Sequence, residues 1–137
     1  MRAFFDSSAY AKRFIAEIGS DEADEICAQS SHLGLTVICV PEVISALNRR
    51  IREKRLARSD YATVKMRLAL ESRDADIINI TDEVLATVVR VLETTTSRTM
   101  DAIHIASAIE WKCDLFVTAD ANQCKAAQAM GLKARRI

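Results

Sequence analysis

Short apolar segments alternate along the chain with longer stretches of helical periodicity. The apolar segments are brief and rich in β-branched or aromatic residues, as strands buried in a parallel sheet tend to be. Strands separated by helices favour right-handed crossovers and a sheet that is covered on both faces. The predicted strands are residues 3–5, 35–40, 77–80, 115–118 and, at one edge, 133–136.

Between these segments, apolar residues recur at the spacing of an amphipathic helix. Pro41 suits the first helical position, and a stripe then runs from Val43 to Ile51. Second and third stripes lie within residues 84–92 and 102–109. The pattern predicts an α/β layered fold.

Glycines and small polar residues mark the predicted connections. Gly34 and Gly131 sit where helices are expected to end, because glycine tolerates the left-handed cap conformation. Thr94–Ser97 is the clearest loop-like segment. With no repeat and no linker in a chain of 137 residues, we expect one domain spanning residues 1–137.

Composition narrows the classes of protein. Half of the residues are apolar and 28% are charged, as in a folded globular domain. Acidic and basic residues balance at 19 each, so attraction to nucleic acid must come from a local patch or from bound cations. Asp6 interrupts the first apolar stretch too early for a secretory signal, and no run approaches a membrane span. We therefore expect a cytoplasmic protein.

The cysteines and histidines lack the spacing of a zinc site. No two cysteines form a CxxC motif, and neither histidine has a cysteine close in sequence. We interpret the cysteines as small buried thiols in a reducing compartment. The residues concerned are Cys27, Cys39, Cys113, Cys124, His32 and His104.

Carboxylates fall at the ends of the predicted strands. Asp6 directly follows the first strand, Glu42 lies two residues past the second, and Asp120 lies two residues past Thr118. Asp101 opens a predicted helix, which normally begins at that same end of the sheet. Ligands of open parallel sheets bind there, and carboxylates gathered in one cleft favour Mg²⁺ or Mn²⁺ over zinc.

Helix capping explains the same positions equally well. Acidic residues are favoured in the first turn of any helix, where they accept hydrogen bonds from free amide groups. Asp82 also follows an apolar segment and begins a predicted helix. Position alone therefore does not separate metal ligands from caps.

Four segments, in order, resemble the motifs of PIN-domain nucleases. These are Phe5–Ala9, Pro41–Leu47, Asp101–Ala108, which is the most specific, and Leu115–Asp120 with its Thr-x-Asp ending. They cover nearly the whole chain, and the chain length is similar to that of the toxin ribonucleases of VapBC-type toxin–antitoxin modules. Asp82 lies outside the motifs and is interpreted as a helix cap.

The resemblance implies a central parallel sheet in the order 3-2-1-4-5, so that Asp6 and Asp120 flank the topological switch point. It implies that Asp6, Glu42, Asp101 and Asp120 hold one or two Mg²⁺ ions, with Mn²⁺ as the other candidate metal. The implied reaction is endonucleolytic hydrolysis of single-stranded RNA that leaves a 5′-phosphate and a 3′-hydroxyl. A cognate antitoxin and a homodimer are further family habits.

Other polar residues near the motifs have two interpretations each. Ser7 and Thr118 either orient a carboxylate or a metal-bound water, or form turn hydrogen bonds. Asn122 either contacts the metal or substrate or serves in a turn. His104 lies one helical turn after Asp101 and acts as a general base or, as we favour, in a hydrogen bond inside the fold. Arg49, two turns after Glu42, binds a substrate phosphate or belongs to a solvated basic helix end.

Two other classes of protein that place acids at strand ends require residues that this sequence lacks. A phosphoacceptor receiver domain needs a paired acid at the first strand and a lysine after the last strand, and neither arrangement is present. A haloacid-dehalogenase-type phosphatase needs an Asp where Ser8 stands. A catalytically idle PIN-like module that binds RNA or protein remains the alternative to a nuclease.

Overall fold

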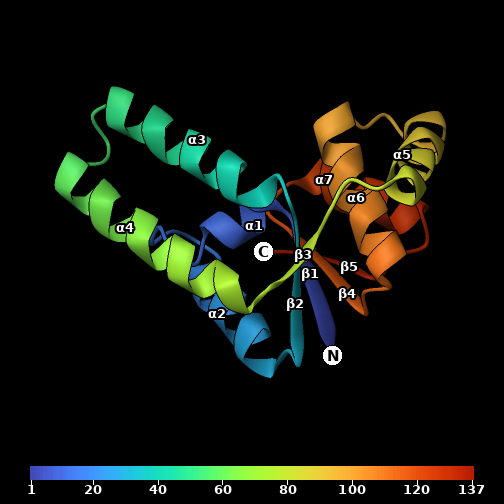
Figure 1. The fold of residues 1–137 in the computed structure, drawn as a ribbon, viewed down its shortest axis with the longest axis horizontal. Helices are drawn as coiled ribbons and strands as arrows, with labels where there is room; N and C mark the ends of the chain where they lie inside the picture. The colour runs from blue at the N-terminus through green and yellow to red at the C-terminus, as the bar shows by residue number, and fades with distance from the viewer.

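A five-stranded parallel sheet runs through the middle of the molecule with helices on both faces (Figure 1). The computed structural model describes residues 1–137. The strands lie in the order β3-β2-β1-β4-β5, which confirms the predicted α/β fold and its strand order. Their bounds are β1 (Arg2–Phe5), β2 (His32–Thr36), β3 (Asp76–Ile78), β4 (Leu115–Thr118) and β5 (Ala134–Arg136).

The helices divide between the two faces by their order in the chain (Figure 1). Those on one face are α1 (Ser7–Ala11), α2 (Ser20–Gln29), α3 (Cys39–Arg52) and α4 (Arg58–Glu71), followed by the 3₁₀ turn Ser72–Asp74. Those on the other face are α5 (Asp82–Thr94), α6 (Thr99–Trp111) and α7 (Ala121–Ala129). No helix combines the length and the apolar character that crossing a membrane requires.

Alternating side chains of the central strands feed two separate apolar cores. Ala3 and Phe5 of β1 belong to the core under α1–α4, whereas Phe4 between them belongs to the core under α5–α7. β4 alternates in the same way, with Phe116 facing the second core. This two-sided burial explains why the strands appear in the sequence as continuous apolar segments.

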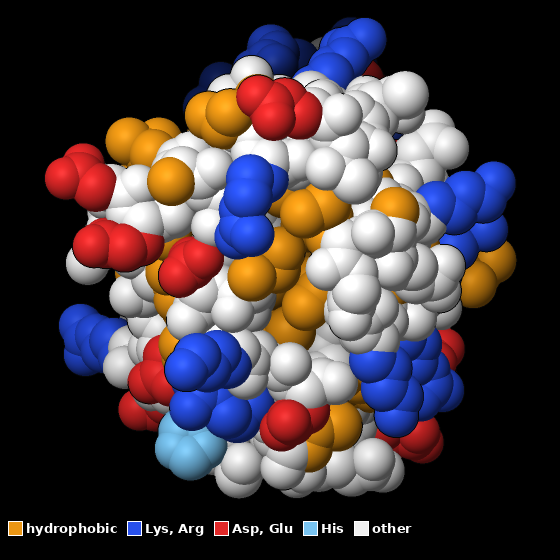
Figure 2. All heavy atoms as spheres, turned by 90° about the vertical axis from the view of Figure 1, so that its right-hand side faces the viewer, with side chains coloured by type: hydrophobic (Ala, Val, Ile, Leu, Met, Phe, Trp, Pro, Cys, Tyr) orange, Lys and Arg blue, Asp and Glu red, His pale blue; other side chains and the backbone are white.

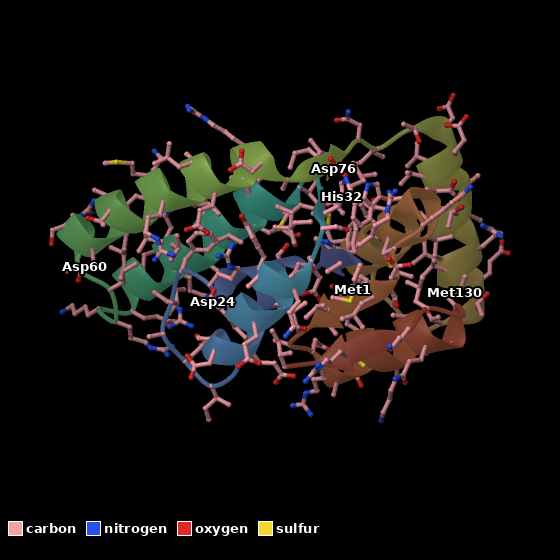
Figure 3. All side chains as sticks on the ribbon, turned by 90° about the horizontal axis from the view of Figure 1, so that it is seen from below. Met1, Asp24, His32, Asp60, Asp76 and Met130 are labelled. Carbon is pink, nitrogen blue, oxygen red and sulfur yellow. The ribbon has the colours of Figure 1, made fainter.

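The strand order reverses at β1, which pairs with β2 on one side and β4 on the other. Phe5 and Val117 are register partners, so β1 and β4 end side by side. Met1, His32 and Asp76 mark the opposite end of the sheet, where the first three strands begin (Figure 3). The carboxyl ends of β1 and β4 therefore form the switch point at which ligands of such sheets bind.

The second predicted strand is misplaced. β2 ends at Thr36 and α3 begins at Cys39, so Pro41 is the third residue of its helix and Glu42 lies six residues past the strand. The apolar run that suggested a strand over residues 35–40 crosses from the end of β2 into the first turn of α3. Both parts contain buried residues, and periodicity alone does not separate them.

The prediction that Gly34 ends a helix is wrong, because Gly34 lies inside β2. A Cβ atom at this position would stand 2.8 Å from the Trp111 ring and 2.9 Å from Phe4, so the glycine permits close packing of α6 on the sheet. Gly131 has the predicted left-handed conformation after α7, with φ of +86°. The loop predicted at residues 94–97 lies, with a shift of one residue, between α5 and α6.

Asp82 is not the cap of α5. The N-cap is Thr81, whose side chain accepts a hydrogen bond from the Val84 amide at 3.2 Å. Asp82 is the first helical residue, where its charge still favours the positive end of the helix dipole. Because the Thr81 hydroxyl already accepts the hydrogen bond of the free amide, Asp82 is not needed as a cap. Its side chain is exposed.

Candidate active site

The four predicted acids line one hollow at the switch point. Asp6 follows β1 and Asp120 follows β4, while Glu42 and Asp101 stand in the first turns of α3 and α6. The structure therefore brings together carboxylates that are up to 114 residues apart in the chain. Elements from both faces of the sheet contribute to the hollow.

Asp6 forms the floor of the hollow and is only 4% exposed. It caps α1, because its Oδ1 accepts hydrogen bonds from the Ala9 amide at 2.9 Å and from Ser8 at 2.6 Å. The Thr118 hydroxyl donates to Oδ2. Burial raises the pKa of Asp6 above its ordinary value, and His104 and these hydrogen bonds oppose that shift. Asp6 therefore caps α1 and lines the hollow with the same side chain.

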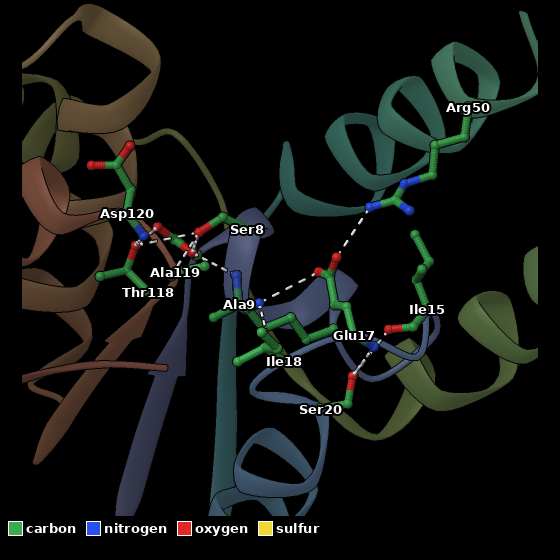
Figure 4. A network of polar contacts seen from close by, with 12 residues as sticks. Ser8, Ala9, Ile15, Glu17, Ile18, Ser20, Arg50, Thr118, Ala119 and Asp120 are labelled. Atoms are coloured by element: carbon green, nitrogen blue, oxygen red, sulfur yellow. Dashed lines mark hydrogen bonds and ion pairs between the residues drawn. The ribbon is translucent and has the colours of Figure 1, made fainter. Parts of the chain in front are cut away.

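Two hydroxyls tie the exits of β1 and β4 together (Figure 4). Thr118 donates to Asp6 and also accepts from the Asp120 amide at 3.0 Å, so it contacts one predicted acid and the backbone of another. Ser8, which the sequence analysis did not single out, donates to Asp6 and accepts from the Ala119 amide at 2.9 Å. Its position two residues after the capping acid was the one available signal.

Glu42 is held by a serine and a histidine. Ser7 donates to Glu42 Oε1 at 2.6 Å, and His104 Nε2 lies 2.5 Å from the same oxygen. Burial raises the pKa of Glu42, but the hydrogen bonds from His104 and Ser7 outweigh it, and the net shift is downward. Ser7 therefore contacts a predicted carboxylate, and His104, which is buried, makes its hydrogen bond to Glu42 while also lining the hollow.

Asp101 and Asp120 form the exposed side of the hollow. Asp120 caps α7 by accepting from the Gln123 amide at 2.9 Å, whereas the Asp101 carboxylate has no hydrogen-bond partner in the protein. Partial burial raises the pKa of Asp101, with His104 lowering it and the charges of Asp120 and Glu42 raising it further. A bound cation would relieve this repulsion.

The donor set fits a hard divalent cation, since the hollow presents carboxylate oxygens and no thiolate. No group of three or more His, Cys, Asp or Glu side chains is close enough in this structure to enclose a metal ion. Magnesium commonly keeps several waters and takes only one or two carboxylates directly.

The two remaining predicted residues lie at the margins of the hollow. Asn122 is the second residue of α7 rather than a turn residue, and it lines an adjoining hollow with Asp101 and Asp120. Arg49 lines another hollow beside Glu42. Gln123, which sequence reasoning missed, donates from Nε2 to the Asp101 carbonyl at 2.9 Å and so links α7 to α6.

Solved structures of toxin–antitoxin proteins share this fold. VapC20 of Mycobacterium tuberculosis, described as a sarcin-ricin loop cleaving toxin, has a TM-score of 0.72 at 15% identity over 98% of this chain and 99% of that one. FitAcB of Neisseria gonorrhoeae has a TM-score of 0.75 at 13% identity, covering 96% and 95%. VapBC2 of Rickettsia felis, solved on a promoter DNA fragment, has 0.72 at 10% identity, covering 100% and 99%.

At these identities the structural likeness establishes the fold alone. No curated protein matches the sequence. The family model described as the PIN domain matches residues 3–129, a span that begins within β1, ends with α7 and contains all four acids of the hollow. The chain therefore belongs to the PIN domain family.

Proposed function

We propose that this protein is a metal-dependent endoribonuclease that hydrolyses single-stranded RNA. The observation that carries the proposal is the convergence of Asp6, Glu42, Asp101 and Asp120 on one hollow at the switch point of the sheet. Membership of the PIN domain family and the fold shared with a sarcin-ricin loop cleaving toxin support it. An idle binding module has no need for a partly buried cluster of carboxylates that repel one another.

In this proposal the four acids hold one or two Mg²⁺ or Mn²⁺ ions, directly or through water. A bound ion supplies an acidified water and neutralises charge at the phosphate. Ser7 and His104 fix Oε1 of Glu42, which leaves Oε2 free to face a ligand. Ser8 and Thr118 fix Asp6 in the same way, so the site is ordered before substrate arrives.

We place the enzyme in the cytoplasm as the toxin of a toxin–antitoxin module, with a small antitoxin that covers the hollow. The structural neighbours support this placement, since one is described as a toxin–antitoxin complex from Klebsiella pneumoniae and another as VapBC-1 from nontypeable Haemophilus influenzae. All four cysteines are free thiols, as suits a reducing compartment.

We propose further that two copies associate through α5. Leu85, Val89 and Leu92 recur on one side of this helix with 47%, 52% and 37% of their surfaces exposed. The side of the molecule formed by α5–α7 shows apolar side chains open to solvent among charged ones (Figure 2). A contiguous exposed apolar patch commonly marks a protein interface.

Val89→Arg should convert a dimer into a monomer, because it places a charge in the centre of the apolar face. Light scattering coupled to size-exclusion chromatography gives the mass of each species. Met66→Arg on α4, where the methionine is 64% exposed, is the matched control and should leave the mass of the wild type unchanged. A monomeric wild type, or a dimeric Val89→Arg protein, contradicts the α5 interface.

Cleavage of labelled single-stranded RNA by the purified protein, free of any partner, tests the nuclease function. We expect cutting with Mg²⁺ or Mn²⁺, none with EDTA, and recovery when excess metal is restored. The products should carry a 5′-phosphate and a 3′-hydroxyl. DNA of the same sequence, tested in parallel, shows whether the sugar matters.

A folded protein that binds RNA but cuts neither nucleic acid with any divalent metal contradicts the nuclease and favours the idle module. Cutting that persists in EDTA contradicts the metal mechanism but still supports the assignment as a nuclease. Circular dichroism of the same preparation confirms that the fold is intact in each case.

A further inference from the structure

A hollow beside the acids continues along α3. It shares Glu42 with the central hollow and is lined farther along by Arg49 and Arg52. Both arginines are exposed and form no ion pair. Arg50, between them in sequence, instead pairs with Glu17 at 3.2 Å (Figure 4). The cations that face the hollow are thus the ones without an acidic partner.

A second hollow continues from the opposite side of the acids. It shares Asp101 and Asp120 with the central hollow and contains Arg98, the N-cap residue of α6. Arg98 is exposed and forms no ion pair. Mostly polar side chains line the rest of this hollow: Thr96, Ser97, Asn122 and Gln123, with Ala126.

The three hollows adjoin, because each outer hollow shares at least one acidic residue with the central one, and together they are called the groove here. Along the groove, the unpaired Arg49 and Arg52 lie at one end, the carboxylates in the middle and the unpaired Arg98 at the other end. The net charge of the chain is +0, so the molecule as a whole does not attract a polyanion. The free energy that holds a phosphate backbone near the acids must therefore come from cations inside this groove.

We infer that a single strand of RNA lies along the whole groove, with Arg49 and Arg52 binding phosphate on one side of the cleaved bond and Arg98 binding phosphate on the other. This inference rests on the proposed nuclease function. Asp6 lines the central hollow and is only 4% exposed, so in this inference the strand bends inward at the acids. Cations on both sides hold the strand in that bend, and guanidinium groups bind phosphate in two-pronged geometry.

Binding measurements on a cleavage-deficient Asp101→Asn background test the groove without relying on catalysis. The probe is a fluorescein-labelled single-stranded RNA of about ten nucleotides, within the range that one strand-binding fold covers. Its affinity is measured by fluorescence anisotropy with Mg²⁺ across a salt series. The logarithm of the binding constant falls with the logarithm of salt by about 0.7 for each phosphate contact.

Arg98→Ala should weaken binding and reduce the salt slope by about 0.7, and the pair Arg49→Ala with Arg52→Ala should reduce it by about 1.4. The triple variant should lose both amounts, because the ends of the groove act on different phosphates. Charge-matched controls are Arg55→Ala and Lys125→Ala, exposed cations that line none of the three hollows. Both controls should keep the slope of the background protein.

Unchanged slopes in the groove variants, losses equal to those of the controls, or no RNA binding by the background protein would each overturn the groove. Failure of the nuclease is seen separately, as absence of cutting by the wild-type protein. A strand that binds with the expected slopes but is not cut leaves the groove in place and removes the catalytic assignment.

Discussion

Replacing Asp101 by asparagine should lower the rate of RNA cleavage by more than about 100-fold, since even groups that only orient a metal ligand are worth about 10–100-fold. The substitution keeps the side-chain shape and removes the negative charge. Asp101 makes no side-chain hydrogen bond to the protein and is exposed at the hollow, so its loss should not disturb the fold. Single-turnover cleavage of labelled RNA gives the rate constant.

Asp82→Asn is the matched control. Asp82 is also an exposed acid in the first turn of a helix, but it lies outside the hollow. The Asp82→Asn protein should cleave RNA at the wild-type rate, and both variants should melt at the wild-type temperature. The loss of rate in Asp101→Asn then comes from the hollow and not from a change in the fold. In a bacterial host, induced wild-type protein should arrest growth and the Asp101→Asn protein should not. Full cleavage by Asp101→Asn would remove this residue from the proposed mechanism.

Gly34→Ala should lower the free energy of unfolding by about 1–3 kcal/mol, the usual cost of overpacking a well-packed core. The added Cβ would meet Trp111 ring atoms at 2.8 Å and Phe4 at 2.9 Å. Phe4 also stacks on Phe116, and the Arg2 guanidinium lies over the Trp111 ring, so both rings have further contacts that hold them in place. Strand propensity alone predicts the opposite sign, because alanine loses less backbone entropy than glycine. Urea denaturation of the wild type and the variant measures the difference.

Gly131→Ala separates the two reasons for keeping a glycine. A Cβ atom there meets nothing within 4 Å, but the backbone φ is +86°. The cost should therefore be the strain of a left-handed residue alone, about 1 kcal/mol. A neutral or stabilising Gly34→Ala would mean that Trp111 gives way easily, and that α6 does not need its close approach to β2.

Most of the fold could be predicted because buried parallel strands are short, apolar and bounded by polar helix starts. β4 begins and ends where the pattern placed it, and β1 differs by one residue. The boundary between β2 and α3 was missed because one apolar run serves both a buried strand end and a buried helix start. Hydrophobicity does not show where the backbone turns within such a run.

The candidate site also has a part that the sequence pattern predicts and a part that it does not. The convergence of the acids could be predicted, since strand exits in a parallel sheet lie on one edge. The contact between His104 and Glu42 joins residues 62 apart, on helices that cover opposite faces of the sheet, and no local pattern encodes it. Ser8 escaped notice for a related reason, because its second partner, the Ala119 amide, lies 111 residues away. Long-range hydrogen bonds appear only once the helices are placed.

The division of the acids between the two faces of the sheet affects the order in which the protein is made. Asp6 and Glu42 leave the ribosome early, with the helices of the first face. Asp101 and Asp120 follow with α6 and α7, and the edge strand β5 comes last. A chain still under synthesis lacks half of its carboxylates and one wall of the hollow. Under the proposed nuclease function, the chain cannot cut the messenger RNA that encodes it until translation is nearly complete.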